Sequence, residues 1–279
     1  MRLLIFGLGY SATRIAALAT ANGAVVTATT RDGRDGTLRL AEAGAALAAA
    51  THVLSSVPPD EGADPVLERF GDALDGRRLS YLSSTGVYGD TAGAWVDESA
   101  AVGGRRPARA AADAAWLARG ARVFRLPGIY GPGRSPLERV RDGTAHRVGG
   151  APGRRGVFSR IHVDDLAAGV VRGLDAPPGA YNLADDRPAP HDDAIAFAAA
   201  LLGLPPPPIV PLAALSPMAQ GFHAENRRVA NGKAKRVLGW APRYADYRAG
   251  LRSGLRAVSA ISRPTAASAA PPPASSVQR

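Results

Sequence analysis

The chain has 279 residues, no cysteine and a formal net charge of +10. Without cysteine it has neither disulfides nor thiolate metal sites, and its arginines are spread along the chain instead of forming the blocks typical of nucleic-acid binding. No run reaches the roughly twenty apolar residues needed to cross a bilayer, and glycines interrupt the first apolar run too early for a signal peptide. We therefore expect a cytoplasmic protein that acts on a small molecule, with no nucleic acid, membrane or metal.

The first thirty residues predict a βαβ unit. Residues 3–6 are wholly apolar and end in glycine, as in a parallel strand buried on both faces. Residues 11–21 are rich in alanine and suit a helix that Gly23 ends. Residues 24–30 are β-branched and suit a second strand. Strand, glycine turn, helix and strand together form one such unit.

The next segment is short for the same fold. Residues 31–51 leave room for one helix and little more, so we expect the third strand to be shortened or missing. Further strands are predicted at 52–57, 79–83, 122–126 and 180–183, and helices at 64–74, 136–142, 164–174 and 192–202, with Asp164 as the cap of the third of these helices.

These elements indicate an α/β fold: a Rossmann-type, doubly wound, mostly parallel sheet with a small C-terminal substrate lobe. The predicted dinucleotide-binding domain comprises residues 1–126 and 160–176, and the substrate lobe comprises 127–159 and 177–255. Residues 263–279 are Pro, Ala and Ser with little else, which predicts a disordered tail.

The first turn carries a dinucleotide fingerprint, Gly7-Leu8-Gly9-Tyr10-Ser11-Ala12. The first glycine permits a tight turn, the second lets the backbone approach a pyrophosphate, and the small Ala12 lets helix and strand pack closely. Free N–H groups at the start of the helix then bind the phosphates. We therefore expect a dinucleotide cofactor here.

The end of the second strand selects the cofactor. An acidic residue there would bind the ribose 2′-hydroxyl of NAD, but this chain has Thr30 and Arg31. Arg31 suits the 2′-phosphate of NADP, whereas Asp32 just beyond keeps NAD as an alternative. The sequence favours NADP.

Several later segments carry a family resemblance. They are Ser83-Ser84-Thr85-Gly86-Val87-Tyr88-Gly89, Pro127-Gly128-Ile129-Tyr130-Gly131-Pro132-Gly133-Arg134, Arg160-Ile161-His162-Val163-Asp164-Asp165, Tyr181-Asn182-Leu183-Ala184-Asp185-Asp186 and Leu238-Gly239-Trp240. With them the chain resembles the extended or atypical short-chain dehydrogenases/reductases, in the NAD-dependent epimerase/dehydratase group, and within it a bacterial subgroup similar to nucleoside-diphosphate-sugar epimerases. The resemblance also implies that a homodimer can form.

The resemblance further implies which residues form the site. The family's serine or threonine falls at Ser84 and Thr85, and its Tyr-x-x-x-Lys pair falls at Arg105 and Arg109 on the following helix. Because arginine stays protonated, it cannot be the acid/base that the family's tyrosine provides. The implied cofactor contacts beyond the fingerprint are Ser56, Val57, Pro58, Ser83, Arg109, Pro127, Gly128 and Ile129.

The missing tyrosine leaves the reaction open. Tyr88 and Tyr130 are candidate substitute acids, although each belongs to a motif that is usually structural. Thr85-Gly86 stand where sugar dehydratases have an acidic pair, which disfavours dehydration. Phe158 stands where nucleotide-sugar enzymes often have a pyrophosphate-binding arginine, which weakens that substrate class.

Two functions of different class follow. The first is an NADP-dependent oxidoreductase or epimerase that acts on a small carbonyl or hydroxyl compound, sugar-like or anionic. The second is a dinucleotide-binding regulator or sensor without catalytic activity, because the family's tyrosine is lost.

Overall fold

The computed structural model describes residues 1–60, 63–149 and 156–261, and it places side chains as far as residue 255. The tail predicted to be disordered, 263–279, lies outside the described residues. Within the described part, no helix combines the length and the apolar character needed to cross a membrane.

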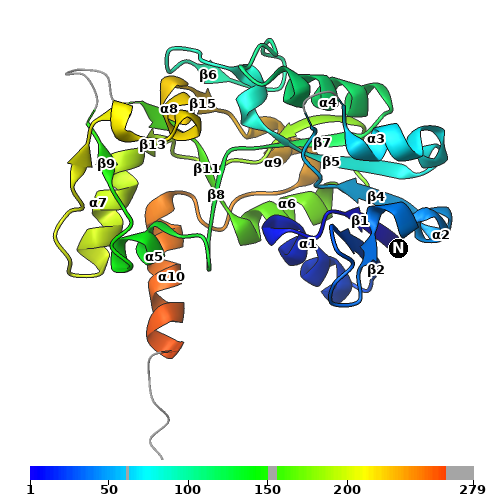
Figure 1. Ribbon diagram of the computed structural model, residues 1–279, viewed down its shortest axis with the longest axis horizontal. Helices are drawn as coiled ribbons and strands as arrows, with labels where there is room; N and C mark the ends of the chain where they lie inside the picture. Colours follow the sequence, from blue (N-terminus) through cyan, green and yellow to red (C-terminus); the bar gives the residue numbers. More distant parts are fainter. Residues whose placement is uncertain (61–62, 150–155, 262–279) are drawn as a thin grey trace, which may run out of the picture.

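A parallel sheet of seven strands forms the centre of the molecule, in the order β12-β7-β5-β4-β1-β2-β3 (Figure 1). Every pairing in it is parallel, so the predicted doubly wound α/β fold is confirmed. The strands are β1 (Arg2–Phe6), β2 (Val25–Thr30), β3 (Leu38–Arg39), β4 (His52–Ser55), β5 (Arg78–Ser84), β7 (Arg122–Leu126) and β12 (Gly179–Asn182).

The third strand is shortened, as predicted. β3 has two residues and pairs with the end of β2, with Thr30 opposite Arg39. The loop before it turns sharply at Gly33 and Gly36, which both have positive φ angles.

Helices cover both faces of the sheet (Figure 1). On one face, α1 (Tyr10–Ala21) packs beside α6 (Val163–Gly173) and α9 (Gly232–Leu238) over an apolar cluster that includes Ile15 and Leu166. The other face is covered by α2 (Gly44–Ala49), α3 (Pro65–Phe70) and α4 (Pro107–Ala118). There the core is centred on Tyr81 and Trp116, whose rings stack 5.4 Å apart. Burial on both faces explains the continuous apolar runs in the strands.

The predicted cap of α6 is wrong by two residues. His162, not Asp164, is the N-cap, because its Nδ1 atom accepts the N–H of Asp164 at 3.2 Å. Asp164 lies in the first turn, where its charge still favours the helix dipole. Asp165 accepts hydrogen bonds from the backbone N–H groups of Arg243 and Tyr244 and so ties the C-terminal segment to α6.

A smaller lobe stands beside the carboxyl ends of β5 and β7. Its helices are α5 (Pro136–Arg141), α7 (His191–Leu201), α8 (Pro217–Ala224) and α10 (Tyr247–Ile261). Its strands form short pairs: β11 (Arg160–His162) with β8 (Gly128–Tyr130), β10 (Val157–Phe158) with β13 (Ala189–Pro190), β14 (Ile209–Val210) with β9 (Arg147–Val148), and β15 (Arg228–Val229) with β6 (Trp95–Val96). α5, α7 and α10 share one apolar cluster around Ile195. β12 joins the main sheet, although its residues fall within the segment 177–255 predicted for the lobe.

Candidate functional site

The turn between β1 and α1 forms an open cradle at the N-terminus of a helix. Gly7 has a φ angle of +85°, and a Cβ atom there would lie 3.0 Å from Cγ2 of Val57. A Cβ atom on Gly9 would meet no described atom within 4 Å, so this part of the backbone is open to a ligand. No side chain caps the first N–H groups of α1. The predicted residues Gly7, Leu8, Gly9, Tyr10, Ser11 and Ala12 thus form a cradle that fits a pyrophosphate.

Side chains from two neighbouring strands hold this turn. The hydroxyl of Thr29 accepts the N–H of Gly7 at 3.0 Å, and the N–H of Leu8 donates to the carbonyl of Thr29 at 2.8 Å. The Ser56 hydroxyl donates to the carbonyl of Gly7. Ser56 and Val57 therefore support the turn, with Pro58 next in the chain. The sequence does not predict this role of Thr29, because a threonine in a strand is not by itself evidence of a binding site.

A second contact ties the cradle to the lobe. The hydroxyl of Tyr10 donates to the carbonyl of Pro132 at 3.1 Å, and the guanidinium of Arg134 lies 5.8 Å from the centre of the Tyr10 ring. The loop after β8 is therefore held against the start of α1. A ligand in the cradle would lie next to this loop.

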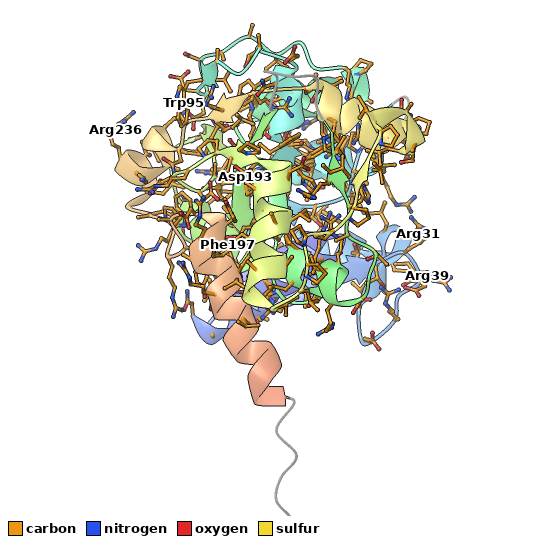
Figure 2. The ribbon with its side chains drawn as sticks, turned by 90° about the vertical axis from the view of Figure 1, so that its left-hand side faces the viewer. Arg31, Arg39, Trp95, Asp193, Phe197 and Arg236 are labelled. Carbon is orange, nitrogen blue, oxygen red and sulfur yellow. The ribbon has the colours of Figure 1, made fainter. Side chains whose placement is uncertain are left out.

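Two arginines lie at the end of β2. Arg31 is exposed, and Arg39 lies opposite Thr30 in β3. Their side chains occur on the same side of the molecule (Figure 2). Asp32, the acidic alternative, is ion-paired with Arg34 at 3.1 Å. Arg39 is a candidate that the sequence analysis missed, because only the pairing of β3 with β2 places it there.

The hydroxyl of Thr30 has an internal role in the same loop. It lies 2.7 Å from the Thr37 hydroxyl and accepts the N–H of Gly33 at 3.0 Å. Thr30 was predicted to contact the cofactor, but the observed bonds show that its hydroxyl shapes the loop after β2.

The carboxyl ends of β5 and β7 open into a cavity of about 300 Å³. Parallel sheets bind ligands at this edge. The lining residues are Ser84, Thr85, Gly86, Arg105, Arg106, Arg109, Leu126, Pro127, Gly128, Ile129, Arg134, Phe222, Glu225 and Arg227. The predicted residues Ser84, Thr85, Arg105, Arg109 and 127–129 are thus brought together at one site.

Ser84 is placed to donate a hydrogen bond into this cavity. It ends β5, and its Oγ atom accepts the N–H of Gly86 at 3.1 Å. That bond uses an oxygen lone pair and leaves the hydroxyl proton for a ligand. Thr85 lies beside it but is almost fully buried.

The cavity is strongly cationic. Five arginines line it, and Glu225 is its one carboxylate among the described lining residues. Glu225 bridges two of these arginines, at 3.0 Å from Arg105 and 2.7 Å from Arg227. Arg106, Arg109 and Arg134 have no carboxylate within ion-pair distance in the described part of the chain, so the site favours an anion.

No protein-family model matches the chain. A conserved protein of unknown function from Silicibacter pomeroyi has 41% sequence identity and a TM-score of 0.84, over 92% of this chain and 98% of that one. The human epimerase family protein SDR39U1, solved with NADPH, has 19% identity and a TM-score of 0.73 over 92% and 99%, which shows the fold alone. A Streptomyces protein named 3-diazoavenalumate denitrifying reductase is 38% identical over 141 residues, or 46% of this chain and 45% of that protein.

The chain is a relative of the Silicibacter pomeroyi protein, and it has the fold of the extended short-chain dehydrogenases/reductases, the NAD-dependent epimerase/dehydratase group. Proteins of this fold have been solved with NADPH and with NAD. The chain covers less than half the length of its Streptomyces relative.

Arg105 and Arg109, which stand at the family's tyrosine and lysine positions, do not both lie on helix α4. Arg105 lies two residues before α4 begins, whereas Arg109 lies in its first turn. Arg109 donates to the hydroxyl of Tyr81 at 3.0 Å. Burial raises the pKa of Tyr81 to about 12, so this tyrosine stays protonated at neutral pH. Arg109 therefore links the cavity to the core of the sheet.

The side chains of Tyr88 and Ser83 belong to a buried network of hydrogen bonds. Ser83 donates to Asp113 at 2.6 Å, and Asp113 pairs with Arg125 at 2.7 Å. Arg125 donates to the Tyr88 hydroxyl, which in turn donates to Asn182 at 2.8 Å. Burial raises the pKa of Tyr88. The structure places Tyr88 outside the cavity as a structural residue, and it turns the side chain of Ser83 away from the cofactor cradle.

Tyr130 also has a structural environment. Its hydroxyl donates to the backbone carbonyl of Asp246 at 3.4 Å and packs against Gly250 on α10. Burial raises its pKa far above the ordinary value for tyrosine. This tyrosine fixes α10 to β8 and is not poised to lose a proton.

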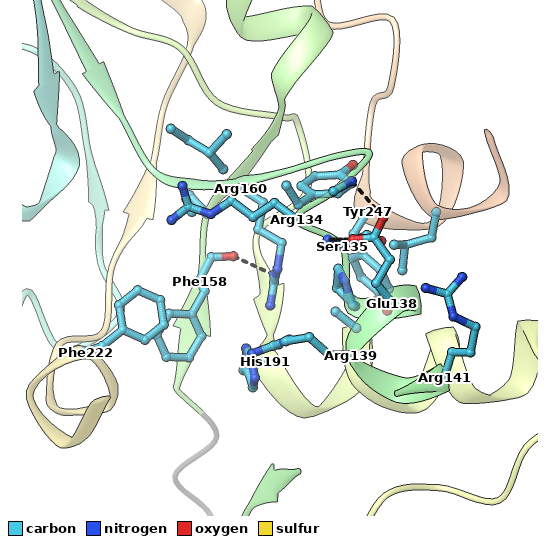
Figure 3. Close-up of a pocket in the computed structure, with 18 of the residues that line it drawn as sticks. Arg134, Ser135, Glu138, Arg139, Arg141, Phe158, Arg160, His191, Phe222 and Tyr247 are labelled. Atoms are coloured by element: carbon cyan, nitrogen blue, oxygen red, sulfur yellow. Dashed lines mark hydrogen bonds between the residues drawn. The ribbon is translucent and has the colours of Figure 1, made fainter. Parts of the chain in front are cut away.

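A larger cavity of about 710 Å³ adjoins the first one in the lobe (Figure 3). The two cavities share four lining residues, Gly128, Ile129, Arg134 and Phe222. The larger one lies among five parts of the chain: β8 with α5, β10 with β11, α7, α8 and α10. The sequence analysis did not find it, because its walls come from five segments that are distant in the chain.

Proposed function

We propose that the protein is an NADPH-dependent reductase that acts on a small anionic substrate. The observation that carries this proposal is the cavity beside Ser84, which combines a free hydroxyl donor with five arginines. The cradle of Gly7 and Gly9 at the start of α1 fits the pyrophosphate of the cofactor.

Charge at the end of β2 favours the phosphorylated cofactor. Arg31 and Arg39 are placed to bind a 2′-phosphate, and the pairing of Asp32 with Arg34 removes the free carboxylate that would favour NAD. When bound, NADPH supplies the hydride. The residues of the chain then orient the acceptor beside it and stabilise the charge that develops.

The cavity provides electrostatic stabilisation in place of a tyrosine. No tyrosine, lysine or histidine lines the smaller cavity in the described part of the chain. The Ser84 hydroxyl donates to the acceptor group, and the guanidinium groups of Arg106 and Arg109 stabilise negative charge near it. Water supplies any proton that the product needs.

An acceptor that takes up hydride without a coupled proton needs no acid from this site. The Streptomyces relative is named for the denitrifying reduction of a diazo acid. In such a reaction R–N₂⁺ and hydride give R–H and N₂, so charge and atoms balance without an acid. The acid group of such a substrate would bind to an arginine of the two adjoining cavities. We extend this substrate class, a diazo or similarly electron-poor organic acid, to the present chain.

A second candidate is a dinucleotide-binding regulator. It is favoured by the replacement of the family's acid/base pair by Arg105 and Arg109, each of which is already bonded within the protein. Such a protein would bind NADPH and reduce nothing.

Loss of NADPH absorbance in the presence of a panel of acceptors tests the proposal. The panel contains aryl diazonium carboxylates, aldehydes, ketones and nucleotide sugars. Turnover with an anionic acceptor, lost in Ser84→Ala, would support the reductase. Tight NADPH binding without turnover on any acceptor would instead establish the regulator.

A further inference from the structure

An aromatic wall lines the larger cavity. The rings of Phe158 and Phe222 stack with centroids 4.7 Å apart and planes 14° from parallel. The ring of His191 meets Phe158 edge-on at 6.2 Å, and His223 meets it edge-on at 5.4 Å. Phe222 is 42% exposed although it is apolar, so one of its faces is available to a ligand. A flat ring is the shape that this wall complements.

The two histidines do not add positive charge to the wall. Burial, together with the nearby Arg160 and Arg139, lowers the pKa of His191 to about 3. Burial also lowers the pKa of His223. Both rings are therefore neutral at pH 7 and contribute aromatic surface.

Among the arginines that line this cavity alone, one has no described partner, and it lies near His191 of the aromatic wall. Arg139 on α5 lines the cavity, and its guanidinium has no hydrogen-bond or ion-pair partner among the described residues (Figure 3). Arg160 donates instead to the backbone carbonyls of Phe158, Ala189 and Pro190. Arg141 pairs with Asp142 at 3.1 Å. Arg139 is thus the group on this wall that is ready to bind an anion.

We propose that the larger cavity binds the far end of an elongated substrate, an aryl carboxylate whose ring lies against Phe158 and Phe222 and whose carboxylate pairs with Arg139. This inference rests on the proposed function, because the reacting end of the same molecule lies at Ser84. The shared lining residues Gly128 and Ile129 join the two cavities into one site. Together the cavities have the size of a site for a small organic molecule.

A nucleoside diphosphate fits this wall less well. Its diphosphate carries several negative charges, whereas among the arginines that line this cavity alone (Arg139, Arg141 and Arg160) only Arg139 has no partner in the described chain. The carboxylate of Glu138 lies on the same wall and accepts the N–H groups of Gly133 and Ser135. A single carboxylate matches the charge of Arg139, and arginine and carboxylate commonly form a bidentate pair.

Calorimetric titration with trans-cinnamate as the probe tests the inference without turnover. We expect saturable binding to the full chain, weakened at least tenfold in Arg139→Gln and at most twofold in Arg141→Gln, the paired arginine on the same helix. The methyl ester of cinnamate should bind weakly to both proteins and show no dependence on Arg139. NADPH titration of the same variants checks that each is folded.

Three outcomes would overturn the inference: no binding of cinnamate, equal weakening by both substitutions, or tighter binding of uridine diphosphate than of cinnamate. Each is independent of whether NADPH reduces anything. A protein that binds cinnamate through Arg139 but fails every turnover assay would refute the reductase and leave the subsite standing.

Discussion

Asp113 on α4 and Arg125 on β7 meet side-on in the buried layer between helix and sheet. The Arg125 Nη2 atom lies 2.7 Å from Oδ1 of Asp113, and the Arg125 Nε atom lies 3.1 Å from Oδ2. Both side chains are almost fully buried. The pair and its hydrogen bonds raise the pKa of Arg125, so the guanidinium is charged at every pH at which the protein folds. This pair fixes α4, and with it Arg109, against the sheet.

Removing one member of this pair should destabilise the fold. We expect Asp113→Ala to lower the free energy of unfolding by about 3–5 kcal/mol, because Arg125 would keep a buried charge without its partner. Urea unfolding followed by circular dichroism measures the loss. Asp72→Ala is the control, since its ion pair with Arg119 lies on the surface and should contribute nothing measurable. Equal losses in the two variants would contradict the assigned role.

The sequence was informative where structure depends on neighbouring residues. The apolar run of β1 and the glycine turn after it require only local geometry, so β1, α1 and the cradle at Gly7 follow from the sequence. The recurring motifs likewise placed Ser84 correctly at the end of β5. The two cavities needed more, because α8 contributes Phe222 from a distant part of the chain.

The misplaced side chains have a common physical cause. Ser83 and Tyr88 stand beside Ser84 in a functional motif, but tertiary hydrogen bonds to Asp113 and Asn182 turn them into the core. The cap of α6 likewise depends on the ring orientation of His162. Strand pairing, which no local pattern reveals, brings Arg39 next to the end of β2.

Cofactor preference should depend on the two arginines at the end of β2. Arg31→Ala and Arg39→Ala should each weaken NADPH binding by about 1–3 kcal/mol, the cost of a lost charged hydrogen bond, and leave NADH binding unchanged. Fluorescence titration with each nucleotide measures this. Arg236→Ala is the control, because Arg236 is exposed on α9, on the other side of the molecule from Arg31 and Arg39 (Figure 2). Equal weakening of NADPH and NADH would show that the arginines do not contact a 2′-phosphate.

Alanine substitutions of Ser84 and of its neighbour Ser83 should have different effects on kcat and on the free energy of unfolding. Ser84→Ala removes the hydroxyl donor of the cavity and should lower kcat by roughly 10²–10³-fold. It also removes the bond from the N–H of Gly86, which should lower the free energy of unfolding by about 1 kcal/mol. Ser83→Ala removes a buried bond to Asp113 and should lower the free energy of unfolding by about 1–3 kcal/mol while kcat changes little. Steady-state kinetics and urea unfolding of both variants provide the comparison. A kcat of Ser84→Ala close to that of the unaltered protein would remove Ser84 from the mechanism.

Asp185 should make the stability depend on pH. Burial raises its pKa to about 8. The positive charge of Arg160 lowers this pKa, whereas the negative charges of Asp246 and Asp186 raise it by smaller amounts. One of its oxygens, Oδ2, has no hydrogen-bond partner among the described residues. The folded protein therefore keeps a proton that the unfolded chain loses above about pH 4. Since unfolding releases this proton, stability should fall as pH rises from about 4 to 8, by up to about 1.4 kcal/mol per pH unit.

Asp185→Asn should remove that fall, because the side chain is neutral in both states. We expect its free energy of unfolding to depend less steeply on pH than that of the unaltered protein across this window, and the difference to stop growing above about pH 8. Urea unfolding at a series of pH values measures both slopes. Asp35→Asn, at an exposed loop position, should keep the slope of the unaltered protein. A slope that Asp185→Asn leaves unchanged would mean that Asp185 is ionised in the folded protein at neutral pH.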